Sequence, residues 1–473
     1  MHSARSDMVE AVQAVEWREA EMAAAEPSAR QFSAWLDVFN SGDRERYATF
    51  LAGNFPARLA FLDQEMAFRE VTGGFDLRKL ERVSATEVSG LVQERTSDQF
   101  AVFELTVAAS EPHVIASLAL TAIPRPAEFP VARLTEGETI AGVQAVLREA
   151  AAQDRFSGAV LVAANGPVLF SGAYGLADRE RGIPNIIQTR FRIGSMNKMF
   201  TAVAILQLTE AGTVGLTAPL GEYLTRYPDR DTAAKVTIGH LLTHAGGTGD
   251  IFGPEFEAHR QELRTLGDYV QLYGGRGLEF EPGSRWQYSN YGFILLGAVI
   301  EQVTGQSYYD YVQAHIYQPA KMTATGSQPE HQAAPDRSEG YTKPPGTAAW
   351  VLNTGTLPYR GTSAGGGYST VEDLARFARA LLGHQLLPPG STQLLITGKT
   401  ELAPGVRYAY GFEDLRDAEG NGPVGHGGGA PGMNGDLKIY PKSGYIVVVL
   451  ANMDPPAAQR IADWLDARLP AQG

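Results

Sequence analysis

Ser195 and Lys198 are the first residues whose types and spacing could do chemistry. They lie three apart in RFRIGSMNKMFTAVAILQLTEAG, where a strand-like run meets Gly194 and a helix is expected to run to Gly212. Residues three apart share one face of a helix, so the ammonium can lie against the hydroxyl. Desolvation lowers a lysine pKa, and the helix dipole favours a developing oxyanion. Together they can turn a weak alcohol into a nucleophile.

The helix that carries Lys198 is apolar almost all round, so we expect it inside the protein. Lys198 is then a charge brought into a core. The alternative is that Ser195 only caps the helix and that Lys198 reaches solvent, as in most chance matches to Ser-x-x-Lys. No other serine in the chain has a lysine three residues on, which favours chemistry.

Tyr288 and Asn290 form the second candidate group, in EPGSRWQYSNYGFILLGAVIEQVTG. A loop ahead of a buried helix can point a phenol and an amide into a cleft. Near a lysine ammonium, Tyr288 is expected to titrate low enough to act as a base, while Asn290 orients a carbonyl. The alternative is that this segment merely caps the helix that follows it.

The third candidate is the glycine-rich segment VGHGGG at 424–429, just ahead of a predicted hairpin. Glycines beside a strand allow close backbone approach, so an N–H from this edge could pair with that of Ser195 as an oxyanion hole. His426 adds a donor or a titrating group. By itself the segment could equally be a loop with one solvated histidine.

Two domains are expected to position these residues. After a helical extension at 1–26, residues 27–123 read as an α+β domain, and the proline-rich stretch 124–138 reads as a linker. The first domain is predicted to hold a helix containing Phe32, Trp35, Leu36 and Phe39, a second helix near 44–52, and antiparallel strands at 83–88, 91–94, 100–107 and 114–122.

The second domain, 139–473, is predicted to be an α/β domain with an antiparallel sheet interrupted by a large helical insertion. Its expected elements are a helix at 139–153, a hairpin around Asn165-Gly166, a closing hairpin within 435–452 and a final helix at 457–469.

Composition excludes several classes of function. Lys and Arg number 40 against 53 Asp and Glu, a net charge of -13, which offers no basic surface for nucleic acid. No window of eighteen apolar residues predicts a membrane span, and the first thirty residues show no export signal. The absence of cysteine removes disulfides, thiolate nucleophiles and cysteine-ligated zinc, but leaves the compartment open.

The three motifs, in this order, resemble the serine β-lactamase and penicillin-binding-protein superfamily. They are most similar to its class C-like branch, which includes D-Ala-D-Ala carboxypeptidases, D-aminopeptidases and family VIII esterases. The resemblance covers roughly 140–470 and includes TIGHLLTHAGG (237–247) and TSAGGGYSTVEDLARFA (362–378). It implies a β-lactamase-like domain of sheet and flanking helices that needs no metal or cofactor.

By position, the resemblance implies that Ser195 is acylated, that Lys198 is its proton partner and that Tyr288 is the general base. Asn290 would contact substrate and lysine, and the amides of Ser195 and Gly429 would form the oxyanion hole. The departure is His426-Gly427-Gly428, where β-lactamases of this branch usually carry Lys-Thr-Gly. A neutral imidazole is a poorer anchor for a β-lactam carboxylate than a fixed ammonium, which favours esterase or peptidase activity.

The N-terminal domain, with AWLDVFNSGDRERYATFL, resembles an NTF2-like (SnoaL-like) α+β cone. Such a domain implies an accessory role: a homodimer contact, substrate gating or partner binding.

The sequence therefore predicts a serine hydrolase that acts through an acyl-enzyme on a small ester or amide. The alternatives are a D-Ala-D-Ala carboxypeptidase or penicillin-binding enzyme with weak β-lactamase activity, and a catalytically weak binding or sensor module. The nucleophile-elbow match at Ser363 and the His240/His244 pair are read as structural. The aromatic residues proposed to face substrate are Trp286, Tyr291 and Trp350.

Overall fold

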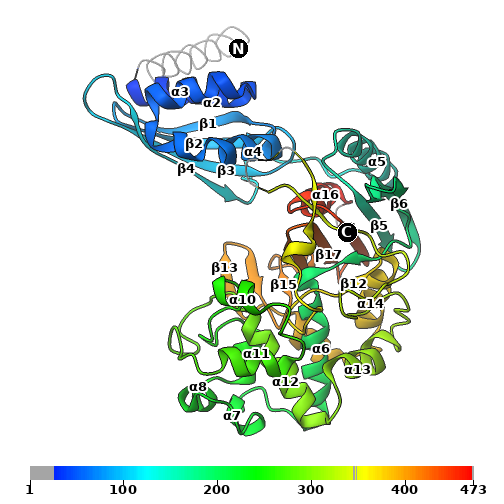
Figure 1. Ribbon diagram of the computed structural model, residues 1–473. Helices are drawn as coiled ribbons and strands as arrows, with labels where there is room; N and C mark the ends of the chain where they lie inside the picture. The colour runs from blue at the N-terminus through cyan, green and yellow to red at the C-terminus, as the bar shows by residue number, and fades with distance from the viewer. Residues whose placement is uncertain (1–25, 345–346, 348, 471–473) are drawn as a thin grey trace, which may run out of the picture. The chain divides into compact units, whose positions relative to one another are not determined.

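The computed structural model describes residues 26–344, 347 and 349–470. The chain forms two compact units (Figure 1). Unit 1 spans Met1–Ala132 and Pro344–Ala348, and unit 2 spans Arg133–Lys343 and Ala349–Gly473. The helical extension predicted at 1–26 lies, except for its last residue, outside the described residues. No helix in the described ranges combines the length and apolar character that crossing a membrane requires.

Unit 1 places helices before a four-stranded antiparallel sheet in the order β1-β2-β3-β4. Helix α2 ends where Gly42 adopts a left-handed φ of 69°, and the Asp43 side chain caps α3. Phe32, Trp35 and Phe39 of α2 are buried against the sheet. The elements are α2 (Pro27–Ser41), α3 (Arg44–Asn54), η1 (Pro56–Phe61), α4 (Leu62–Thr72), β1 (Phe75–Val83), β2 (Glu87–Glu94), β3 (Phe100–Val107) and β4 (Ile115–Ile123).

The strand predicted at 83–88 is wrong. Val83 ends β1 and Val88 lies in β2, and the two pair across a tight turn. The turn closes because the Ser84 amide donates to the Glu87 carbonyl at 2.8 Å and the Glu87 amide donates to Ser84 Oγ at 3.0 Å. Serine favours such local hydrogen bonds, which compete with a continuous strand.

Unit 2 is built on an eight-stranded antiparallel sheet in the order β13-β14-β15-β16-β17-β18-β5-β6. The turn between β5 and β6 carries Asn165 (φ 49°) and Gly166 (φ 110°), the left-handed pair that a two-residue hairpin favours. The strands are β5 (Gly158–Ala164), β6 (Val168–Tyr174), β13 (Thr400–Ala403), β14 (Val406–Tyr408), β15 (Glu413–Asp414), β16 (Val424–Ala430), β17 (Met433–Ile439) and β18 (Tyr445–Ala451).

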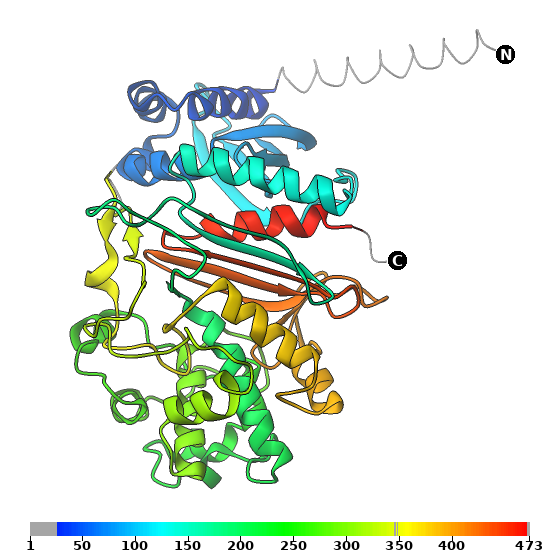
Figure 2. The ribbon, with the colours of Figure 1, turned by 90° about the vertical axis from the view of Figure 1, so that its right-hand side faces the viewer.

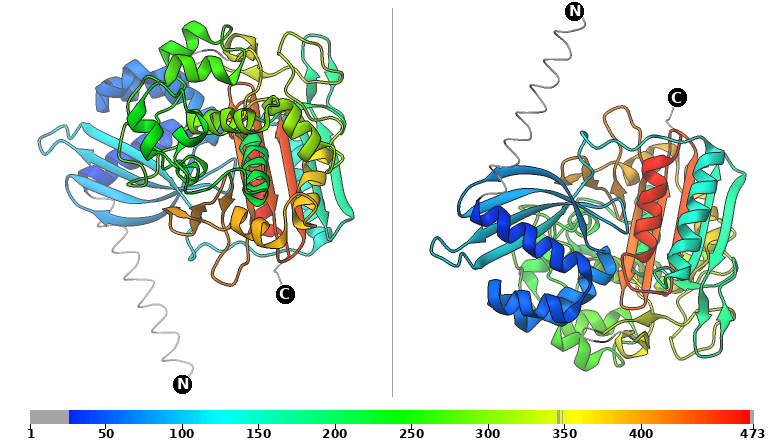
Figure 3. Two further views of the ribbon diagram at one scale, coloured as in Figure 1. Left: turned by 90° about the horizontal axis from the view of Figure 1, so that it is seen from below. Right: turned by 90° about the horizontal axis from the view of Figure 1, so that it is seen from above.

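Helices cover both faces of this sheet, and its central strands are therefore buried on both sides. In β18, Val448 and Leu450 belong to one core, while Val447 and Val449 belong to the other. Helices α5 (Glu136–Ala152) and α16 (Ala457–Arg468) lie side by side on one face (Figure 2; Figure 3). Helix α14 (Val371–Leu382) packs on the other face with the helical insertion.

The helix predicted at 139–153 begins three residues earlier, because Thr135 and Glu138 cap it reciprocally. In sequence, the insertion lies between strand β6 and strand β13. It contributes most of the side chains of the larger of the two cores. Its helices are η2 (Gly194–Met196), α6 (Asn197–Glu210), α7 (Leu220–Tyr223), α8 (Arg230–Lys235), α9 (Ile238–Leu242), α10 (Pro254–His259), α11 (Leu266–Tyr273), α12 (Asn290–Thr304), α13 (Tyr308–Val312), η3 (Gln313–Tyr317), η4 (Asn353–Thr356) and α15 (Pro389–Ile396). Its short strands are β7 (Leu176–Asp178), β8 (Ile183–Pro184), β9 (Phe191–Arg192), β10 (Tyr341–Thr342), β11 (Val351–Leu352) and β12 (Tyr368–Ser369).

Candidate active site

Ser195 lies in the short turn η2, directly ahead of the buried helix α6. The residue before it, Gly194, has a φ of 51°, and a Cβ placed there would lie 3.1 Å from the Gly429 amide nitrogen. Glycine suits position 194 for two reasons: it adopts a left-handed backbone conformation without strain, and it has no side chain that would crowd β16. The strand of the third motif and the turn of the first are in direct contact.

Lys198 is fully buried in the first turn of α6. Its Nζ lies 3.1 Å from Ser195 Oγ, 2.7 Å from Asn290 Oδ1 and 2.5 Å from the Ala364 carbonyl oxygen. Burial lowers the pKa of Lys198 to about 7, and the nearby Asp250 carboxylate partly opposes this shift. A neutral amine has two N–H groups. They donate to Asn290 Oδ1 and to the Ala364 carbonyl oxygen, so the lone pair of the amine faces the Ser195 hydroxyl.

Tyr288 completes a hydrogen-bonded cluster around the serine. Its hydroxyl lies 2.8 Å from Ser195 Oγ and donates to it. Lys198 Nζ lies 4.7 Å from the centroid of the phenol ring. Burial raises the pKa of Tyr288, so the expectation that this phenol titrates low is wrong for the resting site. Of these two groups Lys198 has the lower pKa, so near neutral pH its amine is the one that can accept a proton.

Asn290 is the first residue of α12, and Asp250 fixes its orientation. Asp250 Oδ1 accepts from the Asn290 backbone amide at 2.9 Å, and Oδ2 accepts from Asn290 Nδ2 at 3.1 Å. Because Nδ2 donates to the carboxylate, Oδ1 is the atom that faces Lys198. Sequence reasoning missed both Asp250 and the Ala364 carbonyl. Asp250 comes shortly after the segment 237–247, and Ala364 lies within the segment 362–378; neither residue was singled out there for chemistry.

The third motif is itself a strand, β16, rather than a loop ahead of the hairpin. His426 is buried in it, with Nε2 at 3.0 Å from the Tyr408 hydroxyl and Nδ1 at 2.5 Å from the Gly427 carbonyl oxygen. Burial lowers the pKa of His426 to about 3, so the imidazole is neutral. Gly428 packs against the turn, since a Cβ there would lie 2.0 Å from the Ile193 carbonyl oxygen.

Of the other residues that the sequence singled out, His244 and Trp286 pack beside Tyr288, with ring centroids 4.3 Å and 6.3 Å from that of the phenol. Ser363 is fully buried, and His240 takes part in the cap of α9 through Thr237. Tyr291 does not face substrate, because it is buried and its hydroxyl lies 3.2 Å from that of Tyr227. Trp350 donates to Asp154 instead of lining the serine.

Comparison with known proteins agrees with this geometry. The family model described as β-lactamase matches residues 143–472. Penicillin-binding protein 4* of Bacillus subtilis (strain 168) is 29% identical over 322 residues, which cover 63% of this chain and 69% of that protein. Esterase EstB of Burkholderia gladioli is 36% identical over 212 residues, 41% of this chain and 54% of that protein. The crystal structure of a penicillin-binding protein from Bacillus halodurans has a TM-score of 0.62 at 34% identity and covers 67% of this chain and 98% of that one.

An antiparallel sheet between two layers of helices, with a serine and a lysine at the start of the buried central helix, is the architecture of the β-lactamase-like serine hydrolases. The chain belongs to the β-lactamase family. It is a serine hydrolase of the superfamily that also contains penicillin-binding proteins and esterases, as the sequence resemblance indicated.

Proposed function

We propose that this enzyme hydrolyses small carboxylic esters, and small amides more slowly, through an acyl-enzyme on Ser195. The observation that carries the proposal is the cluster in which Ser195 Oγ lies 3.1 Å from Lys198 Nζ and 2.8 Å from the Tyr288 hydroxyl. A nucleophile held by a base that is itself oriented by further groups is the arrangement that covalent catalysis requires.

The proton steps follow from the two pKa shifts. Lys198, as the amine, accepts the Ser195 proton while Oγ forms a bond to the substrate carbonyl carbon. The intermediate then breaks its bond to the leaving oxygen or nitrogen. Tyr288, which is protonated, gives its proton to that leaving group and regains one from the Lys198 ammonium. The net result is the transfer of one proton from Ser195 to the released alcohol or amine, relayed through Lys198 and Tyr288, which both return to their starting states.

Water completes the cycle by the same groups. It attacks the acyl carbon while the Lys198 amine accepts its proton, and the Lys198 ammonium gives that proton to Ser195 Oγ as the bond between Oγ and the acyl carbon breaks and the carboxylic acid leaves. The amides of Ser195 and Gly429 form the proposed oxyanion hole. The close approach of Gly194 to the Gly429 nitrogen supports this pairing, because it brings the two backbone segments together.

The state of His426 supports esters over β-lactams. A β-lactam or a peptide C-terminus carries a carboxylate, which binds best to a fixed cation. His426 is neutral, and both of its ring nitrogens already have partners in Tyr408 and Gly427. The imidazole that replaces the usual lysine therefore offers the substrate neither a charge nor a free donor.

The second candidate is a D-Ala-D-Ala carboxypeptidase or penicillin-binding enzyme, which the similarity to two penicillin-binding proteins favours. A short-chain nitrophenyl ester and a simple penicillin, each incubated with the same preparation, separate the two. We expect ester turnover without a lasting penicillin adduct in the intact mass. A long-lived adduct with little ester turnover would favour the second candidate.

We also propose that unit 1 is an NTF2-like accessory domain that forms a homodimer. Helices followed by a four-stranded antiparallel sheet support the first part. Exposed large apolar side chains support the second; in unit 1 they are Leu59, Phe61, Phe68, Val71 and Leu77.

A further inference from the structure

Three buried side chains form a hydrogen-bonded chain beside the catalytic cluster and take no part in the steps above. His244 Nε2 lies 2.9 Å from the Tyr408 hydroxyl, and that hydroxyl lies 3.0 Å from His426 Nε2. Each of the three residues is at most 4% exposed. They come from the segment after α9, from β14 and from β16, and 164 residues separate His244 from Tyr408.

The two ends of this chain fix where every proton lies. At one end the Ser289 amide donates to His244 Nδ1 at 3.1 Å, so the ring proton is on Nε2 and points at Tyr408. At the other end the Gly427 carbonyl can only accept, so His426 carries its proton on Nδ1. Its Nε2 then accepts from Tyr408, and each bond has one donor and one acceptor.

Burial keeps all three groups uncharged. It lowers the pKa of both histidines and raises that of Tyr408. The chain thus adds no cation beside Lys198 and leaves no donor of its own without an acceptor. A fully satisfied buried network of this kind has a single arrangement and makes its surroundings rigid.

Each end of the chain is attached to a different part of the active site. His244 holds Ser289, which lies between Tyr288 and Asn290, and its ring centroid is 4.3 Å from that of Tyr288. His426 belongs to β16, the strand that contains the proposed oxyanion amide of Gly429. The three hydrogen-bonded side chains therefore connect the loop that carries Tyr288 to strand β16, which carries the Gly429 amide.

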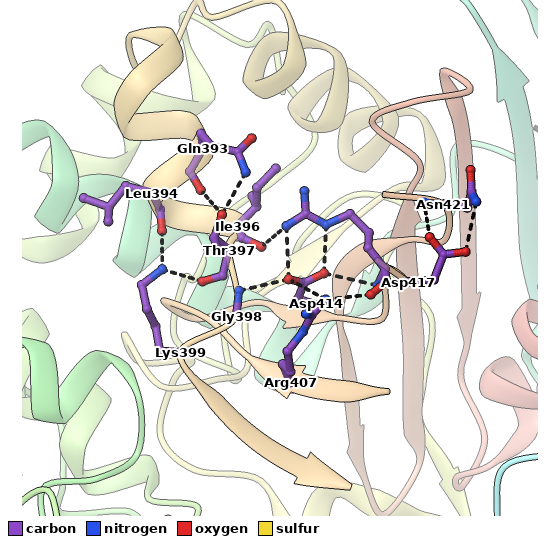
Figure 4. Close-up of polar contacts among 11 residues, drawn as sticks. Gln393, Leu394, Ile396, Thr397, Gly398, Lys399, Arg407, Asp414, Asp417 and Asn421 are labelled. Atoms are coloured by element: carbon purple, nitrogen blue, oxygen red, sulfur yellow. Dashed lines mark hydrogen bonds and ion pairs between the residues drawn. The ribbon is translucent and has the colours of Figure 1, made fainter. Parts of the chain in front are cut away.

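Tyr408, in the middle, lies on a firmly anchored strand. Its neighbour Arg407 pairs with Asp414 of β15. The buried Asp414 carboxylate accepts from the Gly398 amide at 2.9 Å and from Arg416 Nε at 2.8 Å, which ties β15 to the segment after α15 (Figure 4). The hydroxyl between the two imidazoles is thus held from outside the active site.

We propose that Tyr408, through His244 and His426, is a positioning residue that sets Tyr288 and strand β16 at the separation acyl transfer needs. The proposal rests on the proposed function, since it concerns the same site. None of the three side chains contacts the reacting atoms in it, so their effect is on the geometry of the phenol and the oxyanion amide.

Tyr408→Phe tests the proposal, because it removes the joining hydroxyl and keeps the ring. We expect kcat to fall by about 10- to 100-fold, the scale of a displacement of about 1 Å, with KM changed by less than about twofold. Tyr440→Phe is the matched control: Tyr440 is buried in the core beneath α5 and α16, and its hydroxyl donates to Asp466. It should lower the melting temperature comparably and leave kcat unchanged.

Nitrogen NMR of the imidazoles gives a readout that does not depend on activity. In the wild-type enzyme His244 should be protonated at Nε2 and His426 at Nδ1, and in Tyr408→Phe both Nε2 signals should shift. Equal tautomers or a cationic ring in the wild-type enzyme would overturn the proposal, even if the variant failed to fold. So would a kcat for Tyr408→Phe that stays within twofold of wild type.

The two proposals fail in different ways. If Ser195 is not the nucleophile, Ser195→Ala keeps its turnover while the tautomers are as stated. If only the positioning role is wrong, the wild-type enzyme forms its acyl-enzyme and Tyr408→Phe does so at the same rate.

Discussion

Lys198 is an ordinary cation in water, but burial among apolar side chains of α6 brings its pKa to about 7. The proposed mechanism needs the amine form of Lys198, because only the lone pair can accept the Ser195 proton. Protonation below the pKa removes that lone pair. The sign of the pH dependence is therefore fixed: activity is lost as the pH falls.

The first prediction is an acid limb in kcat/KM with a midpoint near pH 7 and a slope of about tenfold per pH unit below it. Initial rates on a nitrophenyl ester from pH 5 to 9 measure it. A flat profile down to pH 5.5 would contradict the role of Lys198. Lys198→Met should abolish turnover at every pH.

The second prediction separates an acid role from a base role for Tyr288. If the phenol protonates the leaving group, Tyr288→Phe should slow hydrolysis of an alkyl ester by roughly 100-fold or more. A nitrophenyl ester, whose leaving group needs no proton, should be affected much less. Equal losses on both esters would instead return the base role to Tyr288.

At the scale of elements, strand β16 and turn η2 must lie at a fixed separation. The third prediction is that Gly428→Ala lowers kcat by about 100-fold, because its Cβ would lie 2.0 Å from the Ile193 carbonyl and must push the strand away. In Gly427→Ala the nearest atom to the new Cβ is 3.6 Å away, so the loss should be much smaller. Steady-state rates of the two folded variants decide this, and equal losses would contradict it.

Many of the helices and hairpins that position the site could be predicted from the sequence. The apolar pattern of α6 indicated a buried Lys198, and the Asn165-Gly166 and 442–444 turns indicated the two hairpins that the structure contains. Asp250 and Tyr408 could not be found this way. They reach the site from loops and strands distant in sequence, and only the folded chain brings them together.

The pKa of Tyr288 shows a second property that the sequence alone could not predict. The sequence indicated a nearby cation, which lowers a phenol pKa, but not how deeply the ring is buried, which raises it. Burial is the largest cause of the raised pKa of Tyr288, and the hydrogen bond with Ser195 opposes it only in part. The strand wrongly predicted at 83–88 has a similar cause, since Ser84 and Glu87 close a turn through local hydrogen bonds that β-propensity alone does not indicate.

At the scale of the whole molecule, the fourth prediction concerns oligomeric state. Sedimentation of the full chain should give twice the chain mass, and Phe61→Asp should shift it toward monomer, because Phe61 is 52% exposed in unit 1. Phe252→Asp is the control, since Phe252 is 62% exposed but belongs to unit 2. A wild-type chain that sediments as a monomer would contradict the dimer.

The proposed mechanism requires one covalent bond, between the substrate acyl group and Ser195. The most direct test is intact-mass spectrometry of the full-length enzyme, quenched in acid during turnover of a slow nitrophenyl ester, followed by peptide mapping. We predict a mass increase of one acyl group on the peptide that contains Ser195, and neither adduct nor turnover in Ser195→Ala. An acyl group on another residue, or full turnover by Ser195→Ala, would contradict the central claim.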